Sequence, residues 1–260
     1  MVSVDLRLTG GWTIQPMIDV HVHLGVSRST GKATTADEIF AAMSTYGIEV
    51  AMVMPQPTDP DRDAVHERIY DLTQRCPGRI AGIANLDPRV ETAVYEKQFV
   101  HCIEELKFIA VKVHTHGFAL PADAPEWEKV YALAAERQLP VMVHTGIGRE
   151  IADPSRVASA AARYPGIPFV LCHAGVIDYI GAAIETASRH QNVYLEPSWC
   201  PTFAVFRMLK ALGSERIMFG SDHLDNIPVE VARYNVLGLT DGQRADIYTN
   251  TARRVFRLPA

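Results

Sequence analysis

The chain has 260 residues, of which 48% are hydrophobic and 21% are charged, and its formal net charge is −5. This composition supplies material for a large core and excludes a chain that is disordered throughout. The 25 basic residues do not outnumber the 30 acidic ones, so nucleic acid is not expected as a partner.

Cysteine usage and hydropathy bear on the cellular compartment. The four cysteines are far apart and form no Cys-x-x-Cys unit, which predicts neither a disulfide framework nor a zinc ribbon. The segment Met1–Arg7 lacks the basic start and apolar centre of a signal peptide, and no apolar run approaches the roughly 20 residues of a membrane span. We therefore expect a cytoplasmic protein with no membrane contact.

Short apolar runs bounded by turn residues recur along the chain and predict strands. They lie near residues 17–22, 48–54, 79–84, 108–114, 140–144, 168–173, 192–196 and 216–221. Helical patterns separate them and span Thr35–Tyr46, Asp61–Arg75, Val90–Leu106, Glu126–Arg137, Pro154–Tyr164, Tyr179–His190 and Phe203–Leu212. The segment Thr240–Arg257 is expected to add one terminal helix.

Eight apolar strands that alternate with helices predict a parallel sheet covered on both faces, and eight units are the number that closes a (β/α)8 TIM barrel. A doubly wound open sheet is the structural alternative. In its usual nucleotide-binding role it would carry a glycine fingerprint after an early strand, but the turn here reads His23-Leu24-Gly25-Val26-Ser27. No linker divides the chain, so we predict one barrel domain over residues 1–260.

The predicted strands end on side chains that bind metals. His21 and His23 are two residues apart on the first strand, so regular alternation places both on one face, with Asp19 one step deeper. Three later strands end on His144, His173 and Asp222. Cys172 precedes His173 and is expected to point to the opposite side as a packing residue.

In a parallel barrel the carboxyl ends of the strands converge on one rim, so these side chains are expected to meet there. Imidazole and carboxylate ligands suit divalent zinc, manganese, iron or nickel. The pattern therefore predicts a catalytic metal centre, with zinc as the first choice.

The chain resembles the amidohydrolase superfamily, most closely its amidohydrolase-2 branch, in the motifs Ile18–His23, Val143–Gly146, Cys172–Gly175, Phe219–Asp222 and Asn250–Phe256. That branch contains metal-dependent hydrolases, lactonases and nonoxidative decarboxylases related to aminocarboxymuconate semialdehyde decarboxylase. The resemblance covers nearly the whole chain and implies the same barrel fold.

The resemblance also implies roles for individual residues. His21, His23 and His144 match metal ligands, and Asp222 matches a metal ligand or the acceptor of the proton of the attacking water. His173 matches a residue that polarises the substrate or assists the water in single-metal members and ligates a second ion in two-metal members. Lys112 is the residue on which this choice turns, because similar lysines are carbamylated between two metals; we favour an unmodified lysine and one ion.

Other polar residues near the strand ends are candidates for substrate binding: His114, His116, Arg149, Glu196, Trp199 and His223. Arg149 would clamp an anionic group, and the loop Gly25–Thr34, with Arg28 and Lys32, would cover the site or recognise an anion. For each of these, a surface or supporting role is the alternative. Asp19 is expected to pack or to hydrogen-bond beneath the ligands.

These expectations describe a metal-dependent hydrolase that attacks a small-molecule amide, cyclic amide, lactone or ester with an activated water. The alternative enzyme is a nonoxidative decarboxylase of a small aromatic or unsaturated acid. A Glu-x-His motif is frequent at the first strand of such decarboxylases, which are also longer, and neither trait is present. A binding scaffold that has lost activity would show gaps in the set, and a homo-oligomer is compatible with the sequence.

Overall fold

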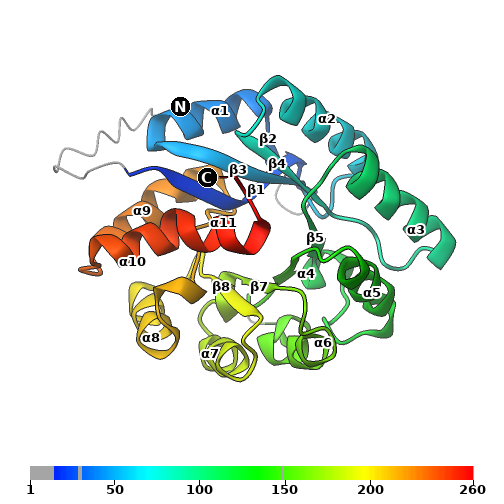
Figure 1. The fold of residues 1–260 in the computed structure, drawn as a ribbon. Helices are drawn as coiled ribbons and strands as arrows, with labels where there is room; N and C mark the ends of the chain where they lie inside the picture. Colours follow the sequence, from blue (N-terminus) through cyan, green and yellow to red (C-terminus); the bar gives the residue numbers. More distant parts are fainter. Residues whose placement is uncertain (1–14, 29–30, 148, 260) are drawn as a thin grey trace.

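Eight strands form one curled sheet in the order β2-β1-β3-β4-β5-β6-β7-β8 in the computed structural model (Figure 1). The structure describes residues 15–28, 31–147 and 149–259, so the segment Met1–Arg7 lies outside the described residues. The strands are β1 (Met17–Val26), β2 (Ala33–Thr34), β3 (Ile48–Pro55), β4 (Ile80–Ala84), β5 (Ala110–Val113), β6 (Val141–His144), β7 (Phe169–Cys172) and β8 (Val193–Glu196). All neighbours pair in parallel except β1 and the short β2, which the sequence did not predict.

The segment 217–222 closes the barrel between β8 and β1, where a full eighth strand was predicted. It forms only two isolated parallel bridges, Leu195↔Ile217 and Val22↔Asp222. Two of its N–H groups find partners outside the sheet: Phe219 donates to the Ile247 carbonyl at 2.9 Å and Ser221 donates to the Asp19 carboxylate at 3.0 Å. Because these donors are taken, a regular ladder cannot form over the whole segment. The TIM barrel is nevertheless confirmed.

Helices surround the strands as an outer ring (Figure 1). They are α1 (Ala36–Tyr46), α2 (Arg62–Arg75), α3 (Thr92–Val100), α4 (Thr115–Phe118), α5 (Glu128–Glu136), α6 (Ala158–Arg163), α7 (Ile180–Arg189), α8 (Thr202–Leu212), α9 (Ile227–Asn235), α10 (Asp241–Ala245) and α11 (Thr251–Phe256). Every predicted helix is present, but α4 and α9 were missed. The predicted terminal helix is divided into α10, a π-helical turn over Asp246–Asn250, and α11.

Two apolar layers hold the barrel together. The larger lies between strands and helices and includes Val22, Leu24 and Val113. The smaller fills the inside of the barrel with side chains such as Ile18 and Val20, and α11 closes its lower end with Ala252, Val255 and Phe256. The inside is therefore solid below, which leaves the opposite end, at the carboxyl ends of the strands, for chemistry. No helix within the described residues has the length and hydropathy to cross a membrane.

Candidate metal centre

A β-bulge turns the two histidines of β1 into the barrel. Asp19 pairs with Ala51 and Val22 pairs with Val53, so Val20 and His21 together face the single residue between those partners. The extra residue shifts the alternation by one. Val20 packs inside the barrel, whereas Val22 and Leu24 pack outside it, and His21 and His23 consequently point inward.

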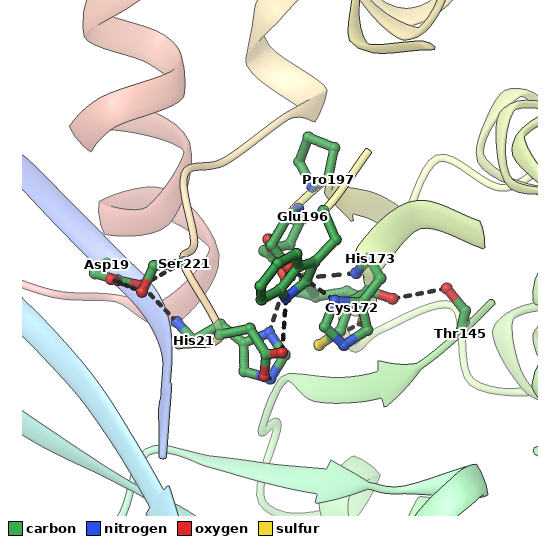
Figure 2. A network of polar contacts seen from close by, with 12 residues as sticks. Asp19, His21, Thr145, Cys172, His173, Glu196, Pro197 and Ser221 are labelled. Carbon is green, nitrogen blue, oxygen red and sulfur yellow. Dashed lines mark hydrogen bonds and ion pairs between the residues drawn. The ribbon is translucent and has the colours of Figure 1, made fainter. Parts of the chain in front are cut away.

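Regular alternation predicted that Asp19 shares a face with the two histidines. Because of the bulge, it does not. Its Oδ1 accepts hydrogen bonds from the His21 N–H at 3.1 Å and from the Ser221 N–H at 3.0 Å, and its Oδ2 accepts from the Ser221 hydroxyl at 2.6 Å. Figure 2 shows Asp19 and Ser221 beside His21. Burial raises the pKa of Asp19 to about 7. The carboxylate satisfies the donor that the bulge exposes.

His21, His23 and Asp222 bring three donor atoms together. Asp222 Oδ1 lies 3.5 Å from His21 Nε2 and 3.3 Å from His23 Nε2. The other ring nitrogens are engaged, since His21 Nδ1 donates to Glu196 Oε2 at 2.8 Å and His23 Nδ1 donates to the Pro55 carbonyl at 3.2 Å. These bonds fix both rings with the Nε2 lone pair toward Asp222, which is how proteins orient metal-binding imidazoles.

Asp222 is positioned by strained backbone and by Trp199. Its φ is 64°, and Trp199 has φ 66°, both in the left-handed region that side chains other than glycine rarely adopt. The indole Nε1–H of Trp199 donates to Asp222 Oδ2 at 2.9 Å, so Oδ1 is left to face the histidines. Burial opposes ionisation of Asp222, but His21, His173 and His23 outweigh it and hold its pKa well below the usual range.

Glu196 lies beneath the site rather than on its rim, where it was expected to contact substrate. It is fully buried, and its oxygens accept from His21 Nδ1, the Ser198 N–H at 2.7 Å and the Ser198 hydroxyl at 3.1 Å (Figure 2). Burial raises its pKa to about 8. A Cβ on Gly220 would come within 2.7 Å of this carboxyl carbon, so only glycine fits there. Glu196 positions His21.

His173 belongs to the same network. Its Nδ1 donates to Ser198 Oγ at 2.8 Å, and that hydroxyl donates onward to Glu196. This tautomer leaves the lone pair of Nε2 free. Burial lowers the pKa of His173 to about 4, so the ring is neutral near pH 7. Glu196 therefore orients two imidazole rings: that of His21 directly, and that of His173 through the Ser198 hydroxyl.

Lys112 points into the barrel, as predicted, and Cys172 does as well. Lys112 Nζ lies 2.9 Å from His21 Nε2 and 3.1 Å from Cys172 Sγ, and the lysine is 1% exposed. Cys172 was expected on the side opposite His173. Instead β7 ends at Cys172 and His173 has φ 63°, so alternation stops and both residues face inward.

His144 and His114 stack at the rim, with ring centroids 4.3 Å apart. Both nitrogens of buried His144 lack a hydrogen-bond partner among the residues that the structure describes. Its ring lies 4.8 Å from that of His173. His114 Nδ1 accepts the Gly117 N–H at 2.9 Å, which places its proton on Nε2 and makes it a donor. Burial lowers the pKa of His144 and of His114 well below the usual range.

The remaining candidates lie farther out. His116 is half-buried with its ring 6.0 Å from that of His144, and burial lowers its pKa. His223 Nε2 lies 3.5 Å from Asp222 Oδ2, and its ring is 5.8 Å from the indole of Trp199. Arg149 is exposed in the loop after β6, and its charge adds to the effect of burial in lowering the pKa of His116.

The donor set fits a divalent cation. Two buried imidazoles present Nε2 to one carboxylate oxygen, and a third, His144, has both nitrogens unpaired in a buried place. An unpaired buried polar atom is costly, so the nitrogens of His144 are available to a ligand. The close group of His21, His23 and Asp222, whose donor atoms lie within 4.8 Å of one another, does not include His144. Nitrogen and oxygen donors without a thiolate suit zinc, manganese, iron or nickel. Metal ligation requires neutral imidazoles, and burial favours that state for His21 and His144.

Sequence reasoning missed two groups that hold the site. Ser198 joins His173 to Glu196, and buried Glu230 accepts from the Trp199 N–H at 2.9 Å and from Asn226 Nδ2 at 2.8 Å. Glu230 also pairs with Arg233. Ser198 stands two residues after Glu196, a spacing that signals a local hydrogen bond. Glu230 lies in α9, a helix that was not predicted, and its sequence gave no comparable signal.

Comparisons with known proteins agree with this geometry. The family model described as Amidohydrolase matches residues 18–258. Among solved structures, an uncharacterised TIM-barrel protein from Bordetella bronchiseptica has a TM-score of 0.75 at 15% identity, covering 94% of this chain and 99% of its own. An amidohydrolase from Burkholderia multivorans with bound zinc has a TM-score of 0.71 at 16% identity, covering 94% and 100%.

A dihydroxybenzoic acid decarboxylase from Polaromonas with bound manganese and an inhibitor has a TM-score of 0.69 at 17% identity, covering 94% of this chain and 97% of its own. At these identities the structural likeness establishes the fold alone. No curated protein matches the chain. The family match, which spans almost every described residue, shows that the chain belongs to the amidohydrolase family.

Proposed function

We propose that the protein hydrolyses a small-molecule amide, cyclic amide, lactone or ester. His21, His23, His144 and Asp222 would hold one divalent ion, with zinc as the first choice and manganese, iron or nickel as alternatives. When bound, such an ion acts as a Lewis acid and lowers the pKa of water. A small substrate and a cytoplasmic location are part of this proposal.

One ion is favoured over two by the surroundings of Lys112. The amine is enclosed by His21 Nε2 at 2.9 Å and Cys172 Sγ at 3.1 Å, and it is almost fully buried. Both contacts are ones that an unmodified amine makes directly through Nζ. In this proposal Lys112 is an unmodified neighbour of His21, and His173 does not ligate a second ion.

The residues of this chain divide the work of proton transfer. Asp222 is ionised, and its Oδ1 accepts the proton of the attacking water, while Trp199 holds Oδ2 so that the carboxylate cannot rotate. Neutral His173 accepts a hydrogen bond at Nε2 and orients that water. His114 presents an N–H that stabilises the charge developing on the substrate carbonyl oxygen.

The observation that carries hydrolysis is the position of Asp222. Attack by water needs a base, and this carboxylate is anchored by an indole N–H through Oδ2, while Oδ1 lies within 3.5 Å of two histidine Nε2 atoms. The pKa of Asp222, which is shifted below its usual range, agrees with that role. Decarboxylation needs instead an acid that protonates carbon, a role to which an ionised carboxylate is poorly suited.

Reaction in ¹⁸O-labelled water tests this proposal. Zinc- and manganese-loaded protein would be incubated with a panel of lactones, cyclic amides, esters and hydroxybenzoates, and products would be analysed by mass spectrometry. We expect ¹⁸O in the new carboxyl group and no release of carbon dioxide. Release of carbon dioxide without ¹⁸O incorporation would replace hydrolysis by decarboxylation.

A further inference from the structure

A pocket near the metal centre contains three arginines. It has a volume of about 490 Å³ and is lined by residues from the loops after β1, β3 and β4, from α2 and from α4. Its polar lining includes Arg28, Arg62, Arg89 and Thr58, and its floor includes Phe118. We call this the arginine pocket. Neither the family match nor the proposed hydrolysis assigns it a role.

Two of the arginines are held in place around one aromatic ring. The guanidinium carbon of Arg62 lies 5.1 Å from the centre of the Phe118 ring and that of Arg89 lies 5.6 Å from it. Arg62 also donates to the Pro57 carbonyl at 3.2 Å. Arg89 donates two hydrogen bonds to Asp87, from Nε to Oδ1 at 2.9 Å and from Nη2 to Oδ2 at 2.7 Å. Stacking and these bonds reduce the entropy that each arginine would lose on binding a ligand.

The pocket carries an excess of positive charge in an acidic protein. Arg28, Arg62 and Arg89 face two carboxylates, Asp59 and Asp87, a difference of 3 − 2 = +1, whereas the whole chain has a charge of −5. Asp59 is occupied by backbone, since its oxygens accept the Val26 N–H at 2.6 Å and the Asp61 N–H at 2.9 Å.

Arg28 is the arginine that remains available. Its backbone N–H donates to Thr58 Oγ1 at 3.0 Å, which leaves the Thr58 hydroxyl proton free to donate into the pocket. Its guanidinium forms no ion pair with the part of the chain that the structure describes. A planar fork of donors matches the two oxygens of a carboxylate or phosphate.

The arginine pocket shares walls with the metal centre. Gly117 lines the pocket and donates its N–H to His114, whose ring is 6.4 Å from that of His23. Pro57 lines it too, two residues beyond Pro55, the carbonyl partner of His23. Gly117 and Pro57 therefore bring the arginine pocket next to the rim histidines.

We propose that the arginine pocket binds a small anion through a carboxylate or phosphate group, with Arg28 as the main contact and Arg62 as the second. The anion is either the charged end of the substrate or a separate effector. The substrate arm rests on the proposed function, but the anion site itself does not, because it can be measured in protein without metal or turnover.

Titration calorimetry of metal-free protein with inorganic phosphate and with malonate, at constant ionic strength, tests the site. We expect saturable binding that Arg28→Ala and Arg62→Ala each weaken by about tenfold, with Arg62→Lys between wild type and alanine because it keeps charge but loses the fork. Arg68→Ala is the matched control, since Arg68 is exposed on the same helix and does not line the pocket. Absence of saturation, or wild-type affinity in both alanine variants, would overturn the proposal.

Metal-loaded protein then separates the two sources of the anion. The probes are an aryl hydroxamate, which binds the ion, and the same compound with an added carboxylate. If the site takes the charged end of the substrate, the carboxylate strengthens binding and Arg28→Ala removes that gain. If it takes an effector, phosphate still binds and the two hydroxamates bind alike. Loss of hydrolysis with retained phosphate binding would refute the proposed function and leave the anion site standing.

Discussion

The inside of the barrel and its rim are built on opposite principles. Inside, Ile18, Val20 and Val170 follow strand alternation and are fully buried apolar side chains. At the rim, function depends on departures from regular backbone: the bulge in β1 and the left-handed residues His173 and Asp222. The comparison indicates that regular alternation of side chains stabilises the barrel, while local departures from regular backbone orient the side chains of the candidate metal centre.

Replacing the proposed base, Asp222, should give the largest effect on activity with the least effect on stability. Asp222→Asn is expected to lower kcat by about 10²–10⁴-fold, because a positioned general base contributes that much. Folding should change little, as the side chain is 14% exposed and isosteric with its replacement. Steady-state kinetics on a substrate from the labelled-water panel, with the urea midpoint as control, would check this. Near wild-type turnover would exclude Asp222 as the base.

A cavity in the interior should give the reverse result. Ile18→Ala removes a fully buried side chain at the closed end of the barrel and is expected to cost about 2–5 kcal/mol in the free energy of unfolding. Metal content and kcat should stay at the wild-type level below the unfolding transition. Urea unfolding and metal analysis measure both. Loss of metal in the folded variant would show that interior and rim are coupled.

Glu196 joins the two regions, since it is buried like the interior but acts on a rim ligand. Glu196→Gln keeps the shape but weakens the bond to His21 Nδ1, and such supporting partners are worth about 10–100-fold in metal affinity. Competition with a chromophoric chelator measures that affinity. Glu185→Gln, on the exposed face of α7, is the control. Unchanged affinity in Glu196→Gln would mean that His21 does not depend on it.

The smallest expected effect is a pH dependence of stability that comes from His66, which is buried between the sheet and the helices. It is buried, its Nε2 accepts the Asn85 N–H at 3.1 Å, and burial lowers its pKa to about 3. The unfolded chain binds a proton near pH 6.5 and the folded chain does not, so stability is full above pH 6.5 and falls by about 1.4 kcal/mol for each unit below it, down to about pH 3. Urea unfolding between pH 7 and 5 should show a smaller slope in His66→Gln, by about 1.4 kcal/mol for each pH unit, while the other buried histidines keep their share. A slope as steep as that of the wild type would assign the whole effect to those groups.

Much of the architecture was accessible from the sequence because apolar runs report burial directly. Seven of the eight predicted strands match regular strands, and four of them, β1, β5, β6 and β7, carry the clustered histidines at or just after their carboxyl ends. The faces of Asp19 and Cys172 were wrong, since alternation assumes an unbroken ladder and cannot foresee a bulge or a left-handed residue. The role of Glu196 was hidden for a different reason. The residues around Glu196 in the sequence do not show that its carboxylate accepts a hydrogen bond from His21, which is 175 residues away.

The bulge in β1 has a consequence for anyone who would graft this centre onto another scaffold. On a strand that kept Ile18 and Val20 inward without the bulge, His21 and His23 would both face the outer layer, because Val20 and His21 both point inward only with the extra residue between Asp19 and Val22. The transferable unit is therefore the five-residue segment Asp19–His23, with the carboxylate that accepts the His21 N–H, and not the two imidazoles alone.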